Sequence, residues 1–239
     1  MGSQGYTSLS RQYLIEQLAS LIVAVPRSHP VRVAIDGISA SGKTTLADEL
    51  MRPIEDRGRP VIRASIDHFH RPRAERYLRG ADSPIGYYLD SFDYSSLCSE
   101  LVVPLGPGGS RLYRPRVFDR LRDTPINIPP HQSPETAILV LDGVFLFRPE
   151  LNHCWDFRIF ISVKFEEAMR RACERDLELL GSAEAIRERY QKRYFAGERM
   201  YLNEVRPHEL ANAVVENSSP LTPCILVQDV WTSPDDLCS

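Results

Sequence analysis

Residues 37–44 have the types and the spacing that phosphate chemistry requires. They read GISASGKT and fit the pattern GxxxxGK[ST] at every position. Glycines let such a backbone curl until successive N–H groups point at phosphate oxygens, and a helix that follows adds its positive N-terminal end. Lys43 would then reach the outer phosphates, and the Thr44 hydroxyl would ligate Mg²⁺. The residues predicted to bind the nucleotide are Gly37, Ile38, Ser39, Ala40, Ser41, Gly42, Lys43, Thr44 and Thr45.

The flanking residues separate this motif from a chance glycine turn. VRVAID (31–36) is a short β-branched run that predicts a buried strand, and TTLADELM (44–51) predicts a helix. A strand before the loop and a helix after it are the context that the pattern requires. A guanine-reading switch protein would normally carry an NKxD-type loop, and no Asn-Lys pair occurs anywhere in the sequence. By elimination, the nucleotide is predicted to be ATP.

Two acidic residues lie where further strands end. Asp67 follows PVIRASI (60–66), and Asp142 follows AILVL (137–141). A carboxylate at Asp67 can accept the proton of an attacking hydroxyl while the loop holds the γ-phosphate in line, or it can cap a turn. Asp142 is placed to hold Mg²⁺ directly or through water, although acids at strand ends are also often structural.

The order of the predicted elements indicates the fold class. Strands predicted at 31–36, 60–67, 137–143, 157–163 and 224–230 are separated by segments with helical character. This alternation is typical of an α/β protein with a doubly wound sheet, whose ligands bind beyond the carboxyl ends of the strands. We therefore expect a P-loop NTPase fold with a mainly parallel five-stranded sheet flanked by helices.

Three sub-regions are expected around this sheet, within a single domain spanning residues 1–239. Apolar residues at helical spacing before Pro26 predict an N-terminal amphipathic helix within residues 1–26. Residues 104–134 are rich in Pro, Gly and Arg, and their segments RLYRPRVF and PINI can each form a short strand of a small acceptor-side β flap. Residues 164–202 are strongly helical and charged, which is the composition of a lid.

The composition excludes several classes of function. Twenty-nine basic and 32 acidic residues leave a net charge of −3, which argues against a general binder of nucleic-acid polymers or anionic membranes. No apolar run reaches the roughly 18 residues of a membrane span, and the first residues lack the pattern of a secretory signal. The five cysteines form no CxxC pair and indicate reduced thiols. We expect a cytoplasmic protein that acts on a small-molecule hydroxyl, with homo-oligomer formation left open.

Further motifs make the chain resemble the uridine kinase and phosphoribulokinase family of P-loop small-molecule kinases, and more narrowly the bacterial proteins described as uridine kinase-like. The resemblance runs from about Val31 to about Asn217. The loop is shared by many families, but the ordered set of the other motifs is much more specific. Those motifs are DHFHRPR, YYLDSFDYSSL, YRPRVFDRLRD, VLDGVFLFRPEL, RRACERD, and ERYQKRYFAGERMYLNEVRP leading to ANAVVEN.

The resemblance implies roles that the spacing alone leaves open. Asp67 would be the general base on the acceptor hydroxyl, and Asp93, in a stretch similar to NFDHP, would bind a ribose diol. The alternative for Asp93 is to cap the helix that follows it. Arg171 and Arg175 would come from the lid and act with Lys43 as catalytic groups on the nucleotide phosphates. From the charge pattern alone, a solvated helix face paired with glutamates would be favoured for these two arginines.

The sequence departs from the true uridine–cytidine kinases at the acceptor side. Those proteins have a tyrosine after DxF, where this chain has His70, and a flap histidine, where this chain has FDRLRD. The metal-side acid is Asp142 where many members have Glu. We expect His70, Phe118 and Arg120 to contact the acceptor.

The predicted function is ATP- and Mg²⁺-dependent phosphoryl transfer to a hydroxyl of a small molecule, with a nucleoside as the first choice. One alternative is a kinase of another metabolite, such as a sugar phosphate, a pantothenate-like acid or nicotinamide riboside. The other is a nucleotide-binding regulator without catalysis. Asp67 argues against the regulator, because a pure binder needs no base at that position.

Overall fold

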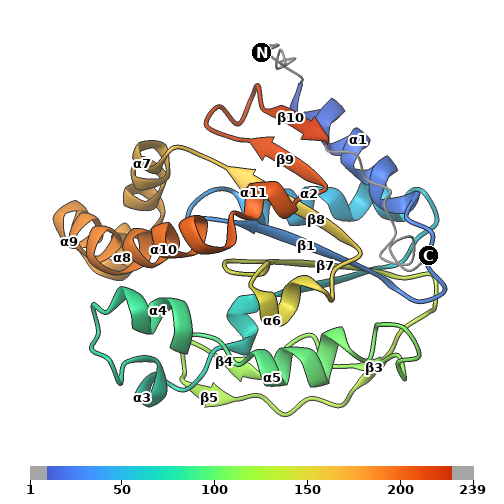
Figure 1. Ribbon diagram of the computed structural model, residues 1–239, viewed down its shortest axis with the longest axis horizontal. Coiled ribbons are helices and arrows are strands. Elements are labelled where there is room, and N and C mark those ends of the chain that lie inside the picture. Colours follow the sequence, from blue (N-terminus) through green and yellow to red (C-terminus); the bar gives the residue numbers. More distant parts are fainter. Residues whose placement is uncertain (1–9, 228–239) are drawn as a thin grey trace.

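The central sheet has six strands. In the computed structural model, which describes residues 10–227, the strands are β1 Val31–Gly37, β2 Val61–Ser65, β7 Ile138–Gly143, β8 Phe157–Ser162, β9 Ala213–Glu216 and β10 Cys224–Val227. Their order is β10-β9-β8-β1-β7-β2, with β1 in the interior of the sheet (Figure 1). All neighbouring pairs are parallel except β9 and β10, which are antiparallel.

The mainly parallel α/β fold is confirmed, but the expected count of five strands is wrong. The additional strand is β9, whose four residues alternate between buried and half-buried. A run this short gives periodicity too little length to separate a strand from a loop. The strand expected at 224–230 is present as β10 over Cys224–Val227, and residues 228–230 lie outside the described residues.

Helices cover both faces of the sheet. α1 (Arg11–Val23) and α2 (Lys43–Glu55) lie on one face, above the strands in Figure 1. α4 (Pro84–Asp90) and α5 (Tyr94–Leu97) lie on the other, where they contribute to a cluster of buried residues that includes many aromatic rings. The shorter helices are η1 Ile66–Phe69, α3 Arg73–Arg76, η2 Cys98–Val102, α6 Pro149–Asn152 and α11 Pro207–Leu210.

The helix expected within residues 1–26 is α1. It begins after Ser10, whose hydroxyl accepts a hydrogen bond from the Tyr13 N–H, and it ends before Pro26. Its buried residues, which include Leu14, Leu18 and Ile22, belong to the same cluster as the apolar side of α2. Packing of this apolar stripe therefore fixes α1 against the helix that follows the glycine-rich loop.

The segment expected to be helical at 164–202 is helical. Its helices are α7 Phe165–Arg175, α8 Leu177–Leu180, α9 Ala183–Arg189, η3 Tyr190–Tyr194 and α10 Phe195–Val205, the last of which continues beyond residue 202. A cluster of buried side chains joins these helices to the loop through Ile38. We call residues 164–202 the lid segment.

The flap expected at 104–134 consists of two ribbons. β3 (Leu112–Tyr113) pairs with β6 (His131–Gln132), and β4 (Phe118–Asp119) pairs with β5 (Thr124–Pro125). The expectation of one continuous strand for RLYRPRVF is wrong, because Pro115 in its middle has no N–H to donate to a ladder. The strand expected for PINI contributes only its first residue to β5.

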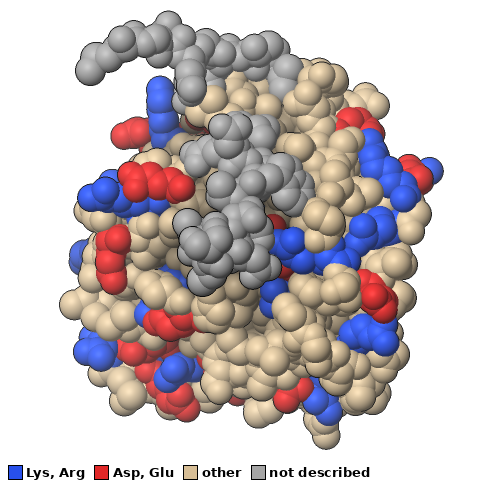
Figure 2. Space-filling model, turned by 45° about the vertical axis from the view of Figure 1, so that its right-hand side comes forward, with Lys and Arg blue, Asp and Glu red and all other residues tan. Residues whose placement is uncertain are grey.

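The surface described by the structure carries mixed charge. On the face shown in Figure 2, basic and acidic side chains are interspersed over the described residues. Within residues 10–227, no helix is long and apolar enough to cross a membrane.

A buried carboxylate fixes the end of β1. Asp36 is fully buried and accepts hydrogen bonds from the Gly37 N–H (2.6 Å), the Phe147 N–H (3.2 Å) and the Tyr201 hydroxyl. Burial raises the pKa of Asp36 to about 6, against the opposing effects of these donors and of the Lys43 charge. The carboxylate therefore joins the start of the loop to the chain after β7 and to α10.

Replacing Tyr201 with Phe should destabilise the protein, because the buried Asp36 carboxylate then loses one of its three donors. We expect the free energy of unfolding in urea to fall by about 1–3 kcal/mol. Tyr13→Phe is the control, since Tyr13 lies 52% exposed on α1. That change should stay within about 0.5 kcal/mol of the wild type. Equal effects of the two substitutions would mean that the Tyr201 hydroxyl does not stabilise Asp36.

Candidate active site

The glycine-rich loop has the geometry of a phosphate cradle. Gly42 has φ +97°, in the left-handed region, and lies at the N-terminus of α2. A Cβ atom at Gly37 would lie 2.7 Å from the Ile161 carbonyl oxygen, and one at Gly42 would lie 2.7 Å from Asn217 Nδ2. Both positions therefore require glycine. The loop ends at a helix of 13 residues, whose first N–H groups have no partner within the helix.

The charged groups beside the loop fit a nucleotide with its magnesium ion. Lys43 Nζ donates to the Ile38 carbonyl at 2.7 Å, so the ammonium group lies across the loop. The Thr44 hydroxyl donates to Asp142 Oδ2 at 2.7 Å, which places two hard oxygen ligands together. The other oxygen of Asp142 is 2.7 Å from Arg63 Nη1.

A magnesium ion at this position would depend on the nucleotide as well. Within the described residues, no group of three or more His, Cys, Asp or Glu side chains could hold a metal ion by itself. Mg²⁺ is commonly bound by one or two carboxylates together with substrate phosphates and water. Thr44 and Asp142 suit that arrangement.

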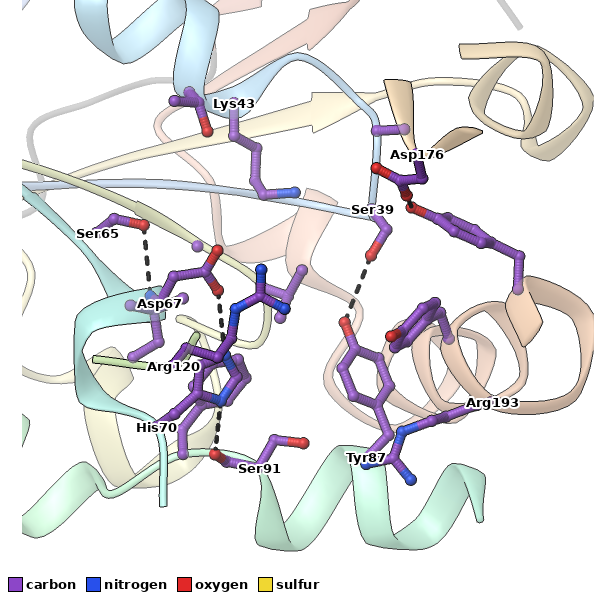
Figure 3. Close-up of a pocket in the computed structure, with 18 of the residues that line it drawn as sticks. Ser39, Lys43, Ser65, Asp67, His70, Tyr87, Ser91, Arg120, Asp176 and Arg193 are labelled. Carbon is purple, nitrogen blue, oxygen red and sulfur yellow. Dashed lines mark hydrogen bonds and ion pairs between the residues drawn. The ribbon is translucent and has the colours of Figure 1, made fainter. Parts of the chain in front are cut away.

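A cavity of about 270 Å³ joins the loop to the acceptor side. Ser39, Lys43 and Thr44 form one end of its wall, and the chain after β2 contributes Asp67 and His70. The lid segment, the flap and the helices between them complete the lining with Arg76, Tyr77, Tyr87, Phe92, Arg120, Arg175, Asp176, Tyr190, Arg193 and Tyr194, among others (Figure 3). The lining is therefore rich in guanidinium groups and aromatic rings.

Asp67 is held by a chain of polar contacts. His70 Nε2 is 3.4 Å from Asp67 Oδ1, and His70 Nδ1 is 2.9 Å from the Ser91 carbonyl oxygen, to which it donates. The imidazole also stacks on Phe92, with ring centroids 4.6 Å apart. These contacts fix the orientation of the imidazole beside the carboxylate (Figure 3).

Asp67 is ionised at neutral pH. Desolvation opposes ionisation, but the hydrogen bond and charge of His70, with the charges of Arg120 and Lys43, outweigh it and lower the pKa of Asp67 to about 2. The side chain is 61% exposed, so its oxygens are accessible from the cavity. Asp67 therefore combines a fixed position with an accessible negative charge.

Most of the residues chosen from the sequence line one cavity. Those lining it are Ser39, Ala40, Lys43, Thr44, Asp67, His70, Arg120, Asp142 and Arg175. Gly37, Ile38, Ser41, Gly42 and Thr45 belong to the loop or the start of α2 without lining the cavity. Asp93, Phe118 and Arg171 also lie outside its lining, as the structure describes it.

Asp93 occupies the N-cap of α5. Its Oδ1 accepts from the Ser96 N–H at 3.0 Å, and its Oδ2 accepts from the Ser96 hydroxyl at 2.5 Å. This is the capping arrangement that was the alternative to diol binding. Phe118 in β4 is 5% exposed and anchors the flap in the core. The substrate-binding roles of both residues stay predictions.

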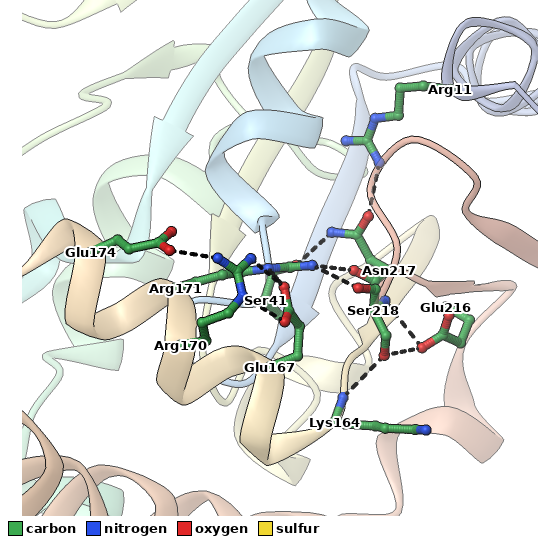
Figure 4. Close-up of polar contacts among 10 residues, drawn as sticks. All are labelled: Arg11, Ser41, Lys164, Glu167, Arg170, Arg171, Glu174, Glu216, Asn217 and Ser218. Atoms are coloured by element: carbon green, nitrogen blue, oxygen red, sulfur yellow. Dashed lines mark hydrogen bonds and ion pairs between the residues drawn. The ribbon is translucent and has the colours of Figure 1, made fainter.

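Arg171 joins the lid segment to the loop and to the end of β9. Its guanidinium group contacts Glu167 Oε1 (2.8 Å) and the carbonyl oxygens of Asn217 (2.6 Å) and Ser41 (3.4 Å) (Figure 4). Arg175, one turn further along α7, pairs with Asp176 at 2.7 Å and donates to the Tyr190 hydroxyl at 2.8 Å. Only Arg175 of the two reaches the cavity lining.

Comparisons with known proteins support the resemblance inferred from the motifs. No family model matches the chain. The chain is 26% identical over 169 residues to uridine-cytidine kinase B of Dictyostelium discoideum, covering 69% of this chain and 66% of the relative, just under two thirds of its length. It is 27% identical over 166 residues to the uridine kinase of Leuconostoc citreum, covering 64% of this chain and 71% of that protein.

A solved structure described as a possible uridine kinase from Bacillus stearothermophilus has a similar fold. Its TM-score is 0.68 at 24% sequence identity, and the match covers 85% of this chain and 97% of that one. The comparisons confirm the P-loop kinase fold and the similarity to uridine kinases that the motifs predicted.

The sequence reasoning missed Glu198, a buried carboxylate on α10. Its Oε1 accepts from the Ser39 N–H (2.8 Å) and the Ser39 hydroxyl (2.6 Å), while the Tyr87 hydroxyl lies 3.3 Å away. Glu198 is 1% exposed, and burial raises its pKa to about 7. Its position in a charged helical segment predicts a solvated residue, so no local pattern indicates this contact with the loop.

Glu198→Gln should make the free energy of unfolding less dependent on pH, because the variant lacks the buried ionisable carboxyl group. The carboxyl binds its proton more tightly in the folded protein than in the unfolded chain, so folding is favoured at low pH. This advantage is lost as the pH rises from about 4.5 through about 7. Between pH 5 and pH 8, the wild type should therefore lose up to roughly 3 kcal/mol relative to the variant.

Urea denaturation at a series of pH values measures this difference. Glu166→Gln, which changes an exposed glutamate on α7, should instead keep a constant difference from the wild type. Parallel pH curves for the wild type and Glu198→Gln would contradict the burial of an ionisable carboxyl beside Ser39.

Proposed function

We propose that this chain, a uridine kinase-like P-loop kinase, transfers the γ-phosphoryl group of ATP to a hydroxyl of a small molecule, with a nucleoside as the first candidate. One observation carries the proposal. A single cavity contains both the loop groups Lys43 and Thr44 and the accessible carboxylate of Asp67. A nucleotide-binding regulator would need the first set of groups without the second.

The loop and its neighbours would hold the donor. The N–H groups of the loop and the Lys43 ammonium bind the phosphates, which lets the γ-phosphoryl group face the acceptor side. Thr44 and Asp142 would hold Mg²⁺, which would neutralise part of the phosphate charge. Burial lowers the pKa of Lys43, although the carboxylates around it oppose that shift.

Asp67 would act as the general base. The acceptor hydroxyl donates its hydrogen bond to this carboxylate, the new bond forms between its oxygen and the γ-phosphorus, and the proton passes to Asp67. The bond from the γ-phosphorus to the β–γ bridging oxygen breaks, and ADP leaves with that oxygen. His70 would keep Asp67 oriented, since it contacts the carboxylate and is itself bonded to Ser91.

The walls of the cavity support a cyclic, polar acceptor. Tyr77, Tyr87 and Phe92 offer ring surfaces against which a sugar or base can pack, and His70 lies on Phe92. The relative from Dictyostelium discoideum is named a uridine-cytidine kinase, which supports a nucleoside as the first acceptor to test. Arg175 is the lid residue proposed to contact the phosphates, because it lines the cavity.

An ADP-release screen over nucleosides, sugar phosphates and pantothenate-like acids tests the proposal. With the best acceptor, Asp67→Asn should lower kcat by roughly 10²–10⁴-fold with little change in the acceptor KM, because the amide keeps the size of the side chain but cannot take a proton.

Asp56→Asn is the control for charge removal alone, since Asp56 lies at the end of α2 and pairs with Arg52 on the surface. It should leave kcat unchanged. Normal turnover by Asp67→Asn would exclude this carboxylate as the base, and no ADP release with any acceptor would contradict the kinase proposal itself.

The ribose-binding role of Asp93 has its own test. Asn caps helices about as well as Asp, so Asp93→Asn should preserve α5 while removing the charge that would bind a diol. If the acceptor is a nucleoside held by Asp93, its binding should weaken by about 1.5–3 kcal/mol, measured as an increase in KM. The penalty should shrink with the 2′-deoxy acceptor.

Ser96→Ala provides the comparison, because it disturbs the cap and keeps the carboxylate. An unchanged KM in Asp93→Asn, or an equal loss with ribose and deoxyribose acceptors, would show that Asp93 only caps α5.

A further inference from the structure

Arg120 differs from the other arginines that line the cavity. Arg76 pairs with Asp123 at 2.9 Å, and Arg175 pairs with Asp176 at 2.7 Å. Arg193 is 2% exposed and donates to backbone carbonyl oxygens near the start of α4. Arg120 makes no hydrogen bond or ion pair with any residue in the range 10–227. Arg76, Arg175 and Arg193 therefore already have protein partners, whereas the Arg120 guanidinium has none among the described residues.

The turn that carries Arg120 is fixed by its neighbours. Asp119 Oδ1 accepts from the N–H groups of Leu121 (2.9 Å) and Arg122 (3.1 Å), which closes the tip between β4 and β5. On the far side of the tip, Asp123 accepts from the Arg73 N–H at 2.9 Å. The backbone at Arg120 is therefore held against the chain that follows Asp67. Because this turn is already fixed, little further ordering of the backbone is needed when the guanidinium group binds a ligand.

The guanidinium group lies at the point where phosphoryl transfer would occur. Figure 3 shows the Arg120 side chain passing Asp67, with its charged end turned to the side on which Lys43 lies. The charges of Arg120 and Lys43 both contribute to lowering the pKa of Asp67. A hydroxyl bound to Asp67 and a phosphoryl group bound to Lys43 would have their reacting atoms between these three side chains.

We propose that Arg120, from the flap, binds the equatorial oxygens of the transferring phosphoryl group and stabilises their charge as it moves from ADP to the acceptor oxygen. This inference rests on the proposed kinase function. The acceptor oxygen–phosphorus bond forms, the bond to the bridging oxygen of ADP breaks, and the hydroxyl proton passes to Asp67. Arg120 donates hydrogen bonds throughout and keeps its own protons.

The same position argues against a role in which Arg120 binds only the acceptor. A group that recognises a distant part of the acceptor would lie beyond Asp67, on the side away from Lys43. The Arg120 guanidinium lies instead beside the Asp67 carboxylate, facing the loop. A planar group with several N–H donors there matches phosphate oxygens, which Lys43 contacts from the other side.

Nucleotide binding tests this role without knowledge of the acceptor. The probes are ADP and ADP with aluminium fluoride, a mimic of the transferring phosphoryl group, each in the presence of Mg²⁺. Arg120→Gln should leave the ADP affinity within about twofold of the wild type and weaken the complex with aluminium fluoride by roughly 10- to 100-fold. Arg120→Lys should recover part of this loss because it restores the charge without the planar donors.

With an acceptor that supports turnover, Arg120→Gln should lower kcat by about 10²–10³-fold and leave the acceptor KM nearly unchanged.

Arg122→Gln is the matched control. Arg122 lies in the same turn, but its side chain is 83% exposed and pairs with Asp119 at 3.0 Å. It should behave as the wild type in both assays. Equal weakening of both probes by Arg120→Gln, or an increase in the acceptor KM alone, would contradict the inference while the kinase function stands. If the wild type binds neither probe, the proposed function fails and the inference fails with it.

Discussion

The structure depends on the carboxylate of Asp36 at the end of the central strand. A buried carboxylate must find donors, and this one finds them in three segments that are far apart in the sequence. It thereby sets where β1 ends, where the chain turns after β7, and how close α10 comes to both. The loop begins at the next residue, so this buried carboxylate sets where the loop starts, while Glu198 and Asn217 hold it further along.

The cavity places positive groups on both sides of a negative one. Lys43 and Arg120 face Asp67 from the loop and from the flap, and Asp142 with Thr44 provides oxygen ligands at the loop end. With positive groups on both sides of Asp67, the site can bind a polyanion while the Asp67 carboxylate keeps a positive neighbour. Together with His70, which contributes most, these two charges keep the pKa of Asp67 low although the carboxylate is close to the place where a phosphate would lie.

Local signals in the sequence predicted the loop and the main strands. Features that depend on contacts between distant residues could not be predicted in this way. The loop was recognisable because Gly37 and Gly42 are required by backbone geometry and close approach. β9 escaped prediction because four residues carry too little periodicity. The flap forms two ribbons, one on each side of Pro115. Whether a proline interrupts a strand depends on the partner strand, which the local sequence does not show. Glu198 could not be predicted, since its helix pattern gives no sign that Ser39, 159 positions away, is its partner.

The contact between Asn217 and the loop has a consequence for the order in which the site is completed during synthesis. Asn217 Nδ2 donates to the Ser41 carbonyl at 2.8 Å, Arg11 donates to Asn217 Oδ1 at 3.2 Å, and Arg171 holds the Asn217 carbonyl oxygen. Ser41 and Arg11 therefore gain these contacts only after Asn217, which is synthesised much later, is in place. A nascent chain that has emerged only as far as α9 contains the whole loop motif but lacks the residue that supports it. We therefore expect nucleotide to assist folding only after the segment that carries Asn217 has also been made.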